Sequence, residues 1–189
     1  YWDSLITNEL NPLRDRTIQE HYPPGSTFKA ITAIAALEEG IVKPDQELKC
    51  GPTFRLGRRV FHDWKRGGHG PTDVYKSLRR SVDVYFYQIA TQLDIDKLAE
   101  YARMFGLGEK TGIPLSRETS GLIPTKEWKL KRSGEEWQLG ETVSCVIGQS
   151  YVLTTPLQLA MAYAAIANGG ILYRPHLIKE IFTNNGEII

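Results

Sequence analysis

The strongest hydrophobic pattern in the chain runs from residue 26 to residue 38, which read Ser-Thr-Phe-Lys-Ala-Ile-Thr-Ala-Ile-Ala-Ala-Leu-Glu. A helix of this sequence is apolar on nearly all sides, which is typical of a helix enclosed in a core. Pro23-Pro24-Gly25 comes just before it and cannot continue regular structure, so the helix is expected to begin at Ser26. Gly40 suits the C-terminal cap. The pattern therefore predicts a buried helix with Ser26 in its first turn.

Further helices are predicted by apolar spacing and by capping residues. An amphipathic helix is indicated by apolar residues at i, i+3, i+4 and i+7 followed by a glycine, namely Leu98, Tyr101, Ala102, Phe105 and Gly106. Asp73 can cap a short helix, and a longer one follows Ser81. Thr155 and Gln158 form a capping-box pattern with proline between them, which predicts a helix that ends at residues 168–170.

The remaining segments predict loops and short strands. Residues 41–70 are expected to form an ordered loop region with short strands, and residues 108–125 a second loop-rich stretch, because glycine and proline are frequent and periodicity is weak. Leu177–Phe182 reads as a strand, and Asn185-Gly186 is a hairpin-turn signal. The returning strand has barely begun at Ile189, so we expect residues 1–189 to be part of one larger domain.

Size and composition fit one globular domain or a large piece of a bigger domain. The chain has 189 residues, enough for one substantial core, and a formal net charge of +1, which gives no reason to expect nucleic-acid binding. Cys50 and Cys145 do not make a disulfide framework, and Cys145 reads as a buried thiol. No apolar run approaches the roughly 20 residues that span a bilayer.

Candidate chemistry lies at the start of the first helix. Residues i and i+3 share a helical face, so the Ser26 hydroxyl and the Lys29 amine can point the same way. Burial favours the neutral form of a lysine, and a neutral lysine can take the proton of a serine nucleophile. In most chance matches to S-x-x-K the lysine simply reaches solvent, but the Pro-Pro-Gly lead-in and the apolar helix favour the catalytic interpretation here. The predicted reaction is attack by Ser26 on a carbonyl.

The segment Tyr22–Lys29 resembles the active-site segment of the class B penicillin-binding proteins, the serine D,D-transpeptidases that crosslink peptidoglycan. The resemblance covers nearly the whole chain and is strongest to elongation-type members. It is carried further by Asn11-Pro12-Leu13, Arg16, Asp63–Gly70, Ser81–Tyr87 and Thr155–Ala160. It implies the α/β (α+β) fold of the transpeptidases and serine β-lactamases, an antiparallel sheet flanked by helices. This chain would carry most of the helical part.

Ser81-Val82-Asp83 resembles the second motif of that superfamily, with aspartate in place of asparagine. The resemblance implies that Ser81 passes a proton between Lys29 and the amine, and that Asp83 holds the network around Lys29. A carboxylate favours the charged form of a lysine and so opposes the effect of burial. The sequence leaves open which effect is larger. A helix N-cap is the alternative role for Ser81 or Asp83, and both roles can hold together.

Lys110-Thr111-Gly112 spells the third motif, K-T-G, but we do not assign it to catalysis. It follows a predicted helix end at Phe105–Gly108 and precedes Ile113-Pro114, so it is expected in a loop, whereas the catalytic motif must lie on a strand beside the cleft. The resemblance places the catalytic K-T-G beyond Ile189. Its strand normally supplies one oxyanion donor, and losing such a donor costs on the order of 100- to 1000-fold in rate. A polypeptide that ends at Ile189 is therefore expected to be nearly inert.

Gly148-Gln149-Ser150 is expected to form a turn beside the cleft without a catalytic role. Family members commonly have Gly-Gln-Gly here, so Ser150 is a departure from the pattern.

Cys50, Asp63 and His69 are candidate ligands for a structural zinc ion. Cysteine, aspartate and histidine all bind zinc, although the spacing matches no standard zinc motif, and such residues in loops usually only form hydrogen bonds. The resemblance adds support, because some elongation-type relatives carry zinc in the corresponding region. Their ligands include a cysteine inside the second motif, where this chain has Val82. No cofactor is required by the predicted reaction.

The resemblance implies a peptidoglycan D,D-transpeptidase that forms an acyl-enzyme on Ser26 and is a target of β-lactam antibiotics. One alternative is a serine β-lactamase, which needs a carboxylate to activate water; Glu118 and Glu135-Glu136 lack the expected sequence context. A second is a β-lactam-sensing domain, and a third is a non-catalytic fragment. The Pro-Pro-Gly lead-in and the segment Asp63–Gly70 favour the biosynthetic enzyme over the first two.

The resemblance also implies partners and a location. The substrates would be peptidoglycan stem peptides. The expected protein partners are a membrane glycan polymerase and elongation scaffold proteins. The full-length protein would be anchored in the bacterial inner membrane with this domain on the periplasmic face, and its membrane anchor and pedestal would lie outside the present sequence.

Overall fold

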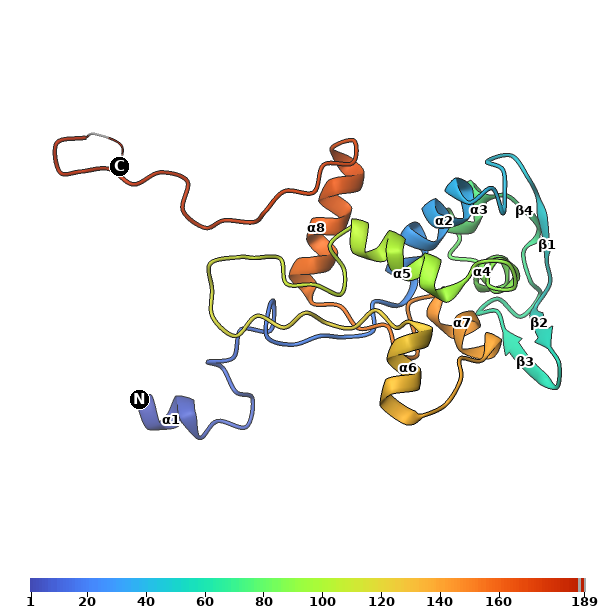
Figure 1. The fold of residues 1–189 in the computed structure, drawn as a ribbon, viewed down its shortest axis with the longest axis horizontal. Coiled ribbons are helices and arrows are strands. Elements are labelled where there is room, and N and C mark those ends of the chain that lie inside the picture. The colour runs from blue at the N-terminus through green and yellow to red at the C-terminus, as the bar shows by residue number, and fades with distance from the viewer. Residues whose placement is uncertain (187, 189) are drawn as a thin grey trace.

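The structure, a computed structural model, describes residues 1–186 and 188. It is a mixed α and β arrangement in which helices dominate (Figure 1). The helical elements are α1 (Trp2–Ile6), the 3-10 helix η1 (Gly25–Phe28), α2 (Lys29–Glu38), α3 (Val74–Arg79), α4 (Asp83–Ile89), α5 (Ile95–Met104), α6 (Lys126–Ser133), α7 (Leu139–Cys145) and α8 (Pro156–Ala167). The strands are β1 (Leu48–Cys50), β2 (Thr53–Leu56), β3 (Arg59–His62) and β4 (Gly70–Thr72).

The core forms around α2, which packs against α3, α4 and α5. Its inward residues are almost fully enclosed, and they join the apolar face of α4 in one hydrophobic cluster. The predicted buried helix is therefore confirmed, with one difference. Its first turn is the tighter 3-10 helix η1, so Ser26 lies in a 3-10 turn that leads directly into α2.

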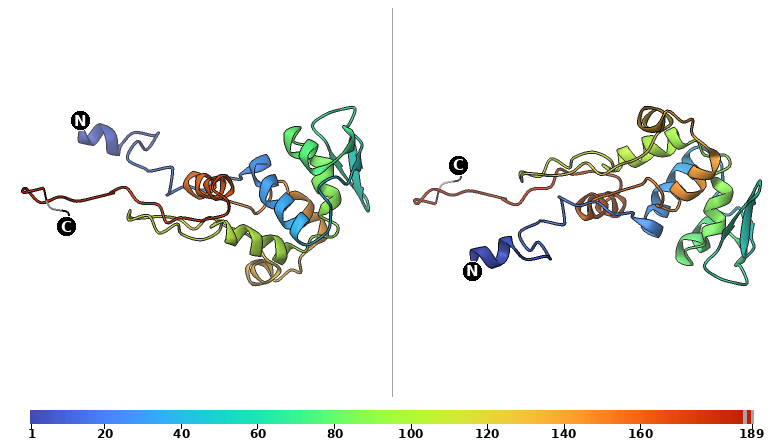
Figure 2. Two further views of the ribbon diagram at one scale, coloured as in Figure 1. Left: turned by 90° about the horizontal axis from the view of Figure 1, so that it is seen from above. Right: turned by 90° about the horizontal axis from the view of Figure 1, so that it is seen from below.

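Two small antiparallel sheets lie beyond α4 at one end of the molecule (Figures 1 and 2). In one sheet β1 pairs with β4, with Cys50 opposite Gly70. In the other β2 pairs with β3, with Phe54 opposite Phe61. The rings of Phe54 and Phe61 both contact Tyr87 of α4, which ties the second sheet to the helical core. The prediction of short strands within residues 41–70 is confirmed.

The predicted caps and helices agree with the structure in most places. Asp73 caps α3 by accepting a hydrogen bond from the Lys76 N–H, and Thr155 and Gln158 form both halves of a capping box at α8. Helices α6 and α7 were not predicted. The sequence of α6 is dominated by charged residues, so its helical period of apolar positions is weak.

The strand predicted at Leu177–Phe182 is wrong for the residues that the structure describes. The segment is an exposed, irregular chain that makes only an isolated bridge between Phe182 and Ile188. A strand needs neighbouring backbone for its hydrogen bonds, and no described segment lies alongside residues 177–181. The predicted turn agrees better, since the Gly186 N–H donates to the Thr183 carbonyl. Both this segment and α1 project from the same side of the molecule (Figure 2).

Both cysteines are free and buried, as predicted for Cys145. Burial raises the pKa of the Cys145 thiol to about 12. Within residues 1–186 and 188, none of the helices combines the length and the apolar character needed to cross a bilayer.

Candidate active site

Ser26 is exposed at the surface, whereas Phe28 and Lys29 after it are buried. The Lys29 N–H donates to the Ser26 carbonyl, which closes the 3-10 turn. Residues i and i+3 eclipse one another in a 3-10 helix, so Ser26 and Lys29 lie on the same side. The structure thus presents the candidate nucleophile to solvent and places the candidate base beneath it.

The Ser26 turn is held by a close backbone contact with Gly148. The Gly25 N–H donates to the Gly148 carbonyl at 2.9 Å. Gly148 has φ +70°, and a Cβ atom added there would lie 2.3 Å from the Gly25 oxygen. Only glycine permits this approach. The sequence predicted a turn at 148–150, but its contact with the nucleophile segment was missed because nothing in a local pattern reports it.

A second missed contact comes from Tyr163 of α8. Its hydroxyl donates to the Thr27 carbonyl at 2.8 Å, across 136 positions of sequence. The sequence pattern of α8 shows Tyr163 only as one residue of a largely apolar helix, so it could not predict this contact.

Lys29 connects the first motif to the second. Its Nζ donates to the Ser81 carbonyl at 3.0 Å, to the Ser81 Oγ at 3.1 Å and to the Asp83 Oδ1 at 2.5 Å. The lysine is only 1% exposed, and its Nζ lies 5.6 Å from the centre of the Phe86 ring. Three acceptor atoms of the second motif thus lie within hydrogen-bond distance of the Lys29 Nζ. The structure brings together Lys29, Ser81 and Asp83, one turn below Ser26.

Ser81 and Asp83 do not serve as the side-chain cap of α4. Val82 is the N-cap residue of α4, and its side chain cannot accept a hydrogen bond. Asp83 lies in the first turn of α4, and its carboxylate forms an ion pair with the Lys29 Nζ. Ser81 has φ +52°, in the left-handed region that residues with a side chain rarely adopt. Here this conformation ends α3, because the Val82 N–H donates to the Ser77 carbonyl and the Ser81 N–H donates to the Leu78 carbonyl. The N-cap role considered for the side chains of Ser81 and Asp83 is therefore not found.

Lys110-Thr111-Gly112 lies in a loop, as predicted. The Glu118 carboxylate organises this loop by accepting hydrogen bonds from the Thr111 N–H at 2.7 Å, the Thr111 hydroxyl at 2.6 Å and the Gly112 N–H at 3.2 Å. Glu118 is itself buried by these contacts. Glu118, one of the carboxylates considered for the β-lactamase alternative, is therefore engaged in holding a loop.

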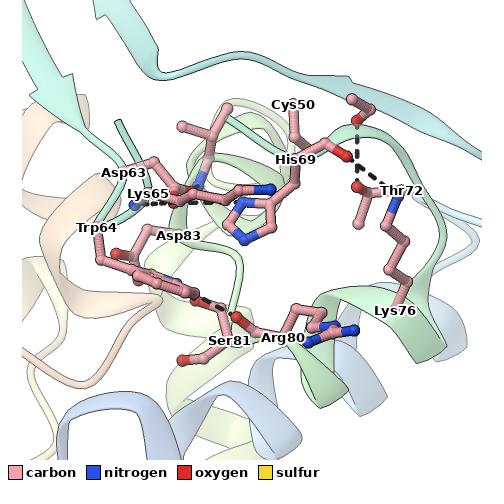
Figure 3. A network of polar contacts seen from close by, with 12 residues as sticks. Cys50, Asp63, Trp64, Lys65, His69, Thr72, Lys76, Arg80, Ser81 and Asp83 are labelled. Carbon is pink, nitrogen blue, oxygen red and sulfur yellow. Dashed lines mark hydrogen bonds and ion pairs between the residues drawn. The ribbon is translucent and has the colours of Figure 1, made fainter. Parts of the chain in front are cut away.

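The three predicted metal ligands are only partly brought together. Asp63 and His69 lie in one loop, with 3.3 Å between the Asp63 Oδ1 and the His69 Nδ1 (Figure 3). The Cys50 Sγ donates to the Leu48 carbonyl and accepts from Gln88. Among residues 1–186 and 188, no group of three histidine, cysteine, aspartate or glutamate side chains could hold a metal ion. Both ring nitrogens of the buried His69 lack a hydrogen-bond partner, but among the described residues only two of the three predicted ligands, Asp63 and His69, come together, so we derive no role for zinc.

The geometry defines a candidate acyl-transfer site built on a serine and a buried lysine, and comparisons with known proteins identify the family of the chain. Residues 3–187 match the family model described as the penicillin binding protein transpeptidase domain. The chain is 41% identical over 179 residues to the peptidoglycan D,D-transpeptidase MrdA of Haemophilus influenzae, covering 94% of this chain and 28% of that protein. The MrdA of Acinetobacter baumannii is 42% identical over 180 residues, covering 94% and 27%.

Solved structures agree with the fold. The chain superposes on the complex of PBP2 and MreC from Helicobacter pylori with a TM-score of 0.88 and 39% identity, over 93% of this chain and 33% of that one. Against Pseudomonas aeruginosa PBP2 in complex with WCK 5153, the TM-score is 0.89 at 37% identity, over 93% and 39%. This chain therefore belongs to the penicillin-binding protein transpeptidase domain family. It spans less than a third of the length of the MrdA relatives.

Proposed function

We propose that the protein containing this chain is a peptidoglycan D,D-transpeptidase, which crosslinks stem peptides through an acyl-enzyme on Ser26. The observation that carries the proposal is the buried Lys29 Nζ, which joins Ser81 and Asp83 one turn below an exposed Ser26. The relatives at about 40% identity that bear this activity in their names support the same reaction.

In the first step, the Ser26 Oγ bonds to the carbonyl carbon of the penultimate D-alanine of a stem peptide. Lys29, in its neutral form, takes the hydroxyl proton, and Ser81 passes a proton to the nitrogen that leaves. The bond between the two D-alanines breaks, and the terminal D-alanine departs as a free amine. Asp83 holds the lysine toward Ser81 throughout.

In the second step, an amine from a neighbouring stem peptide attacks the acyl-enzyme. The new peptide bond forms as the ester to Ser26 breaks, and the proton returns through Lys29 to the serine oxygen. A β-lactam acylates Ser26 by the same first step, but its leaving nitrogen stays attached to the acyl group, so the enzyme is blocked.

We also propose partners and a location for the protein, by extension from its relatives. One solved relative is a complex with MreC, and another is a peptidoglycan synthase complex that coordinates polymerisation and crosslinking. We extend this to the present protein, with a glycan polymerase and elongation scaffold proteins as its partners. With stem peptides as its substrate, this domain would work on the periplasmic face of the inner membrane.

The test is a crosslinking assay with the full-length protein, polymerised glycan bearing pentapeptide stems, and separation of the digested products by mass. The wild type is expected to form crosslinked dimers, and Ser26→Ala to form none. Lys29→Ala is expected to lose about 100- to 10,000-fold, the usual effect of removing a general base. Lys110→Ala changes the look-alike motif and should leave crosslinking unchanged. Crosslinks formed by Ser26→Ala would overturn the proposal.

A further inference from the structure

The loop Asp63–His69, called here the 63–69 loop, contacts the second motif on both sides of Ser81 (Figure 3). Ser81 has φ +52° because it follows the C-terminal cap of α3, where the Val82 N–H donates to the Ser77 carbonyl at 2.9 Å and the Ser81 N–H donates to the Leu78 carbonyl at 3.2 Å. These bonds fix the backbone N–H groups on either side of Ser81 but leave its carbonyl to other partners. The 63–69 loop supplies one of those partners.

Trp64 supplies the contact on the N-terminal side. Its indole Nε1 donates to the Ser81 carbonyl at 3.1 Å and to the Arg80 carbonyl at 3.2 Å. The ring is 63% exposed, so burial of apolar surface does not explain its position. It packs edge-on against His69, with 5.4 Å between ring centres. An exposed tryptophan is thus fixed by hydrogen bonds to the backbone of a candidate catalytic residue.

Trp64 shares its acceptor with the candidate base. The Ser81 carbonyl also accepts from the Lys29 Nζ at 3.0 Å. A carbonyl oxygen has two lone pairs, so the indole and the lysine together use both. The peptide plane of Ser81 is therefore set from two directions, and its side chain lies 3.1 Å from the same lysine.

Asp63 supplies the contact on the C-terminal side. Its Oδ2 accepts from the Val84 N–H at 3.2 Å, in the first turn of α4, and its Oδ1 accepts from the Lys65 N–H at 3.0 Å. The carboxylate is buried, so these bonds are shielded from water. Asp63 takes over the capping task that the side chain of Val82 cannot perform.

The 63–69 loop is itself tied to the β1–β4 sheet. The Asp63 N–H donates to the Pro52 carbonyl, and the His69 N–H donates to the Cys50 carbonyl at 2.8 Å. The Lys76 Nζ donates to the His69 carbonyl at 3.1 Å. Gly68 lies so close to Gly51 that an added Cβ would meet its backbone at 2.5 Å. The loop is therefore a rigid support for the residues it touches.

We propose that Trp64 and Asp63 are positioning residues, which clamp the peptide groups around Ser81 and so aim its hydroxyl at Lys29. The proposal rests on the proposed function, because the benefit appears in the acylation of Ser26. Trp64 acts only through backbone carbonyls. Removing its N–H should therefore slow proton transfer without changing how substrate binds.

The test replaces the indole N–H of the full-length protein in two ways. Trp64→Phe keeps an aromatic ring, and benzothienylalanine at position 64 keeps the two-ring shape while sulfur replaces the N–H. Trp2→Phe, at another exposed tryptophan, is the matched control. Stopped-flow acylation with a fluorescent penicillin, normalised to active sites, separates the acylation rate constant from the dissociation constant of the first complex.

Both position-64 variants are expected to lower the acylation rate constant about 3- to 10-fold, as for loss of one hydrogen bond, with the dissociation constant unchanged. Trp2→Phe should match the wild type. If benzothienylalanine acylates at the wild-type rate, or if only the dissociation constant changes, the clamp is overturned. Failure of the proposed function looks different, since the wild type itself would then not be acylated at Ser26.

Discussion

Gly148 offers the sharpest test of how the nucleophile turn is built. Replacing it with alanine has two separate effects. The first is the backbone conformation, because an L-residue at φ +70° costs about 1–2 kcal/mol. The second is a collision, because the new Cβ would lie 2.3 Å from the Gly25 oxygen and 2.7 Å from the Phe28 Cβ.

Comparison with Gly134 separates the two effects. It has φ +71°, nearly the same as Gly148, but an added Cβ would meet nothing within 4 Å. Gly134→Ala therefore has the backbone cost alone. We expect Gly148→Ala to lower the free energy of unfolding by a further 1–3 kcal/mol or so, the usual range for overpacking.

The collision should also slow the acylation of Ser26. Relieving a 2.3 Å contact requires the Gly25 turn to move by roughly 0.7 Å, and Ser26 moves with it. Because misplacement by about 1 Å can cost roughly 100-fold, acylation by penicillin should fall by about 10- to 100-fold. Urea unfolding and stopped-flow acylation of the full-length variants measure both quantities. If Gly148→Ala and Gly134→Ala behave alike in both assays, the proposed support of Ser26 by Gly148 is wrong.

The other predictions concern stability, titration, thiols and metal. Ser150 has φ +61°, so Ser150→Gly should raise the free energy of unfolding by about 0.5–1 kcal/mol in urea unfolding; no gain would contradict this. Burial alone would raise the pKa of the Glu141 carboxyl, but hydrogen bonds from Lys129, the Gln138 N–H and Tyr151 hold it below the ordinary value of 4.5. A lowered folded-state pKa stabilises the protein above pH 4.5, and this contribution disappears as the pH falls through the folded-state pKa. Glu141→Gln should therefore be less stable than the wild type at pH 7, with the difference vanishing in acid; a difference that persists in acid would count against the ion pair. Cys145 should resist alkylation at pH 8 until the protein is unfolded, because its thiol is buried. Rapid alkylation of Cys145 in the native protein, detected by mass spectrometry, would refute this. Finally, elemental analysis of the wild-type protein should find far less than one zinc ion per chain. One zinc ion per chain in the wild type, absent from the Asp63→Asn variant, would show instead that a metal site forms.

The sequence predicted those parts of the site whose signal is local. The Pro-Pro-Gly lead-in, the apolar helix and the i, i+3 spacing of Ser26 and Lys29 are read within a few residues, and the structure places them accordingly. The pairing of Lys29 with Ser81 and Asp83 spans more than 50 positions. It was reached through family resemblance, since spacing alone cannot show which segments meet.

The parts that were missed depend on tertiary contacts. Gly148, Tyr163 and Trp64 act through backbone atoms of distant residues, so their side chains carry no local signature of the role. The strand predicted at residues 177–182 failed for a related reason. A β-forming sequence becomes a strand only when another strand lies beside it. The described residues supply just the single bridge at Phe182.

The most direct test of the central claim is to locate the penicilloyl adduct by peptide mass mapping after the full-length protein is treated with benzylpenicillin. The account predicts one adduct on Ser26, absent from Ser26→Ala and formed far more slowly in Lys29→Ala. An adduct on another residue, or none in a folded wild-type protein, would contradict the assignment of Ser26 as the nucleophile.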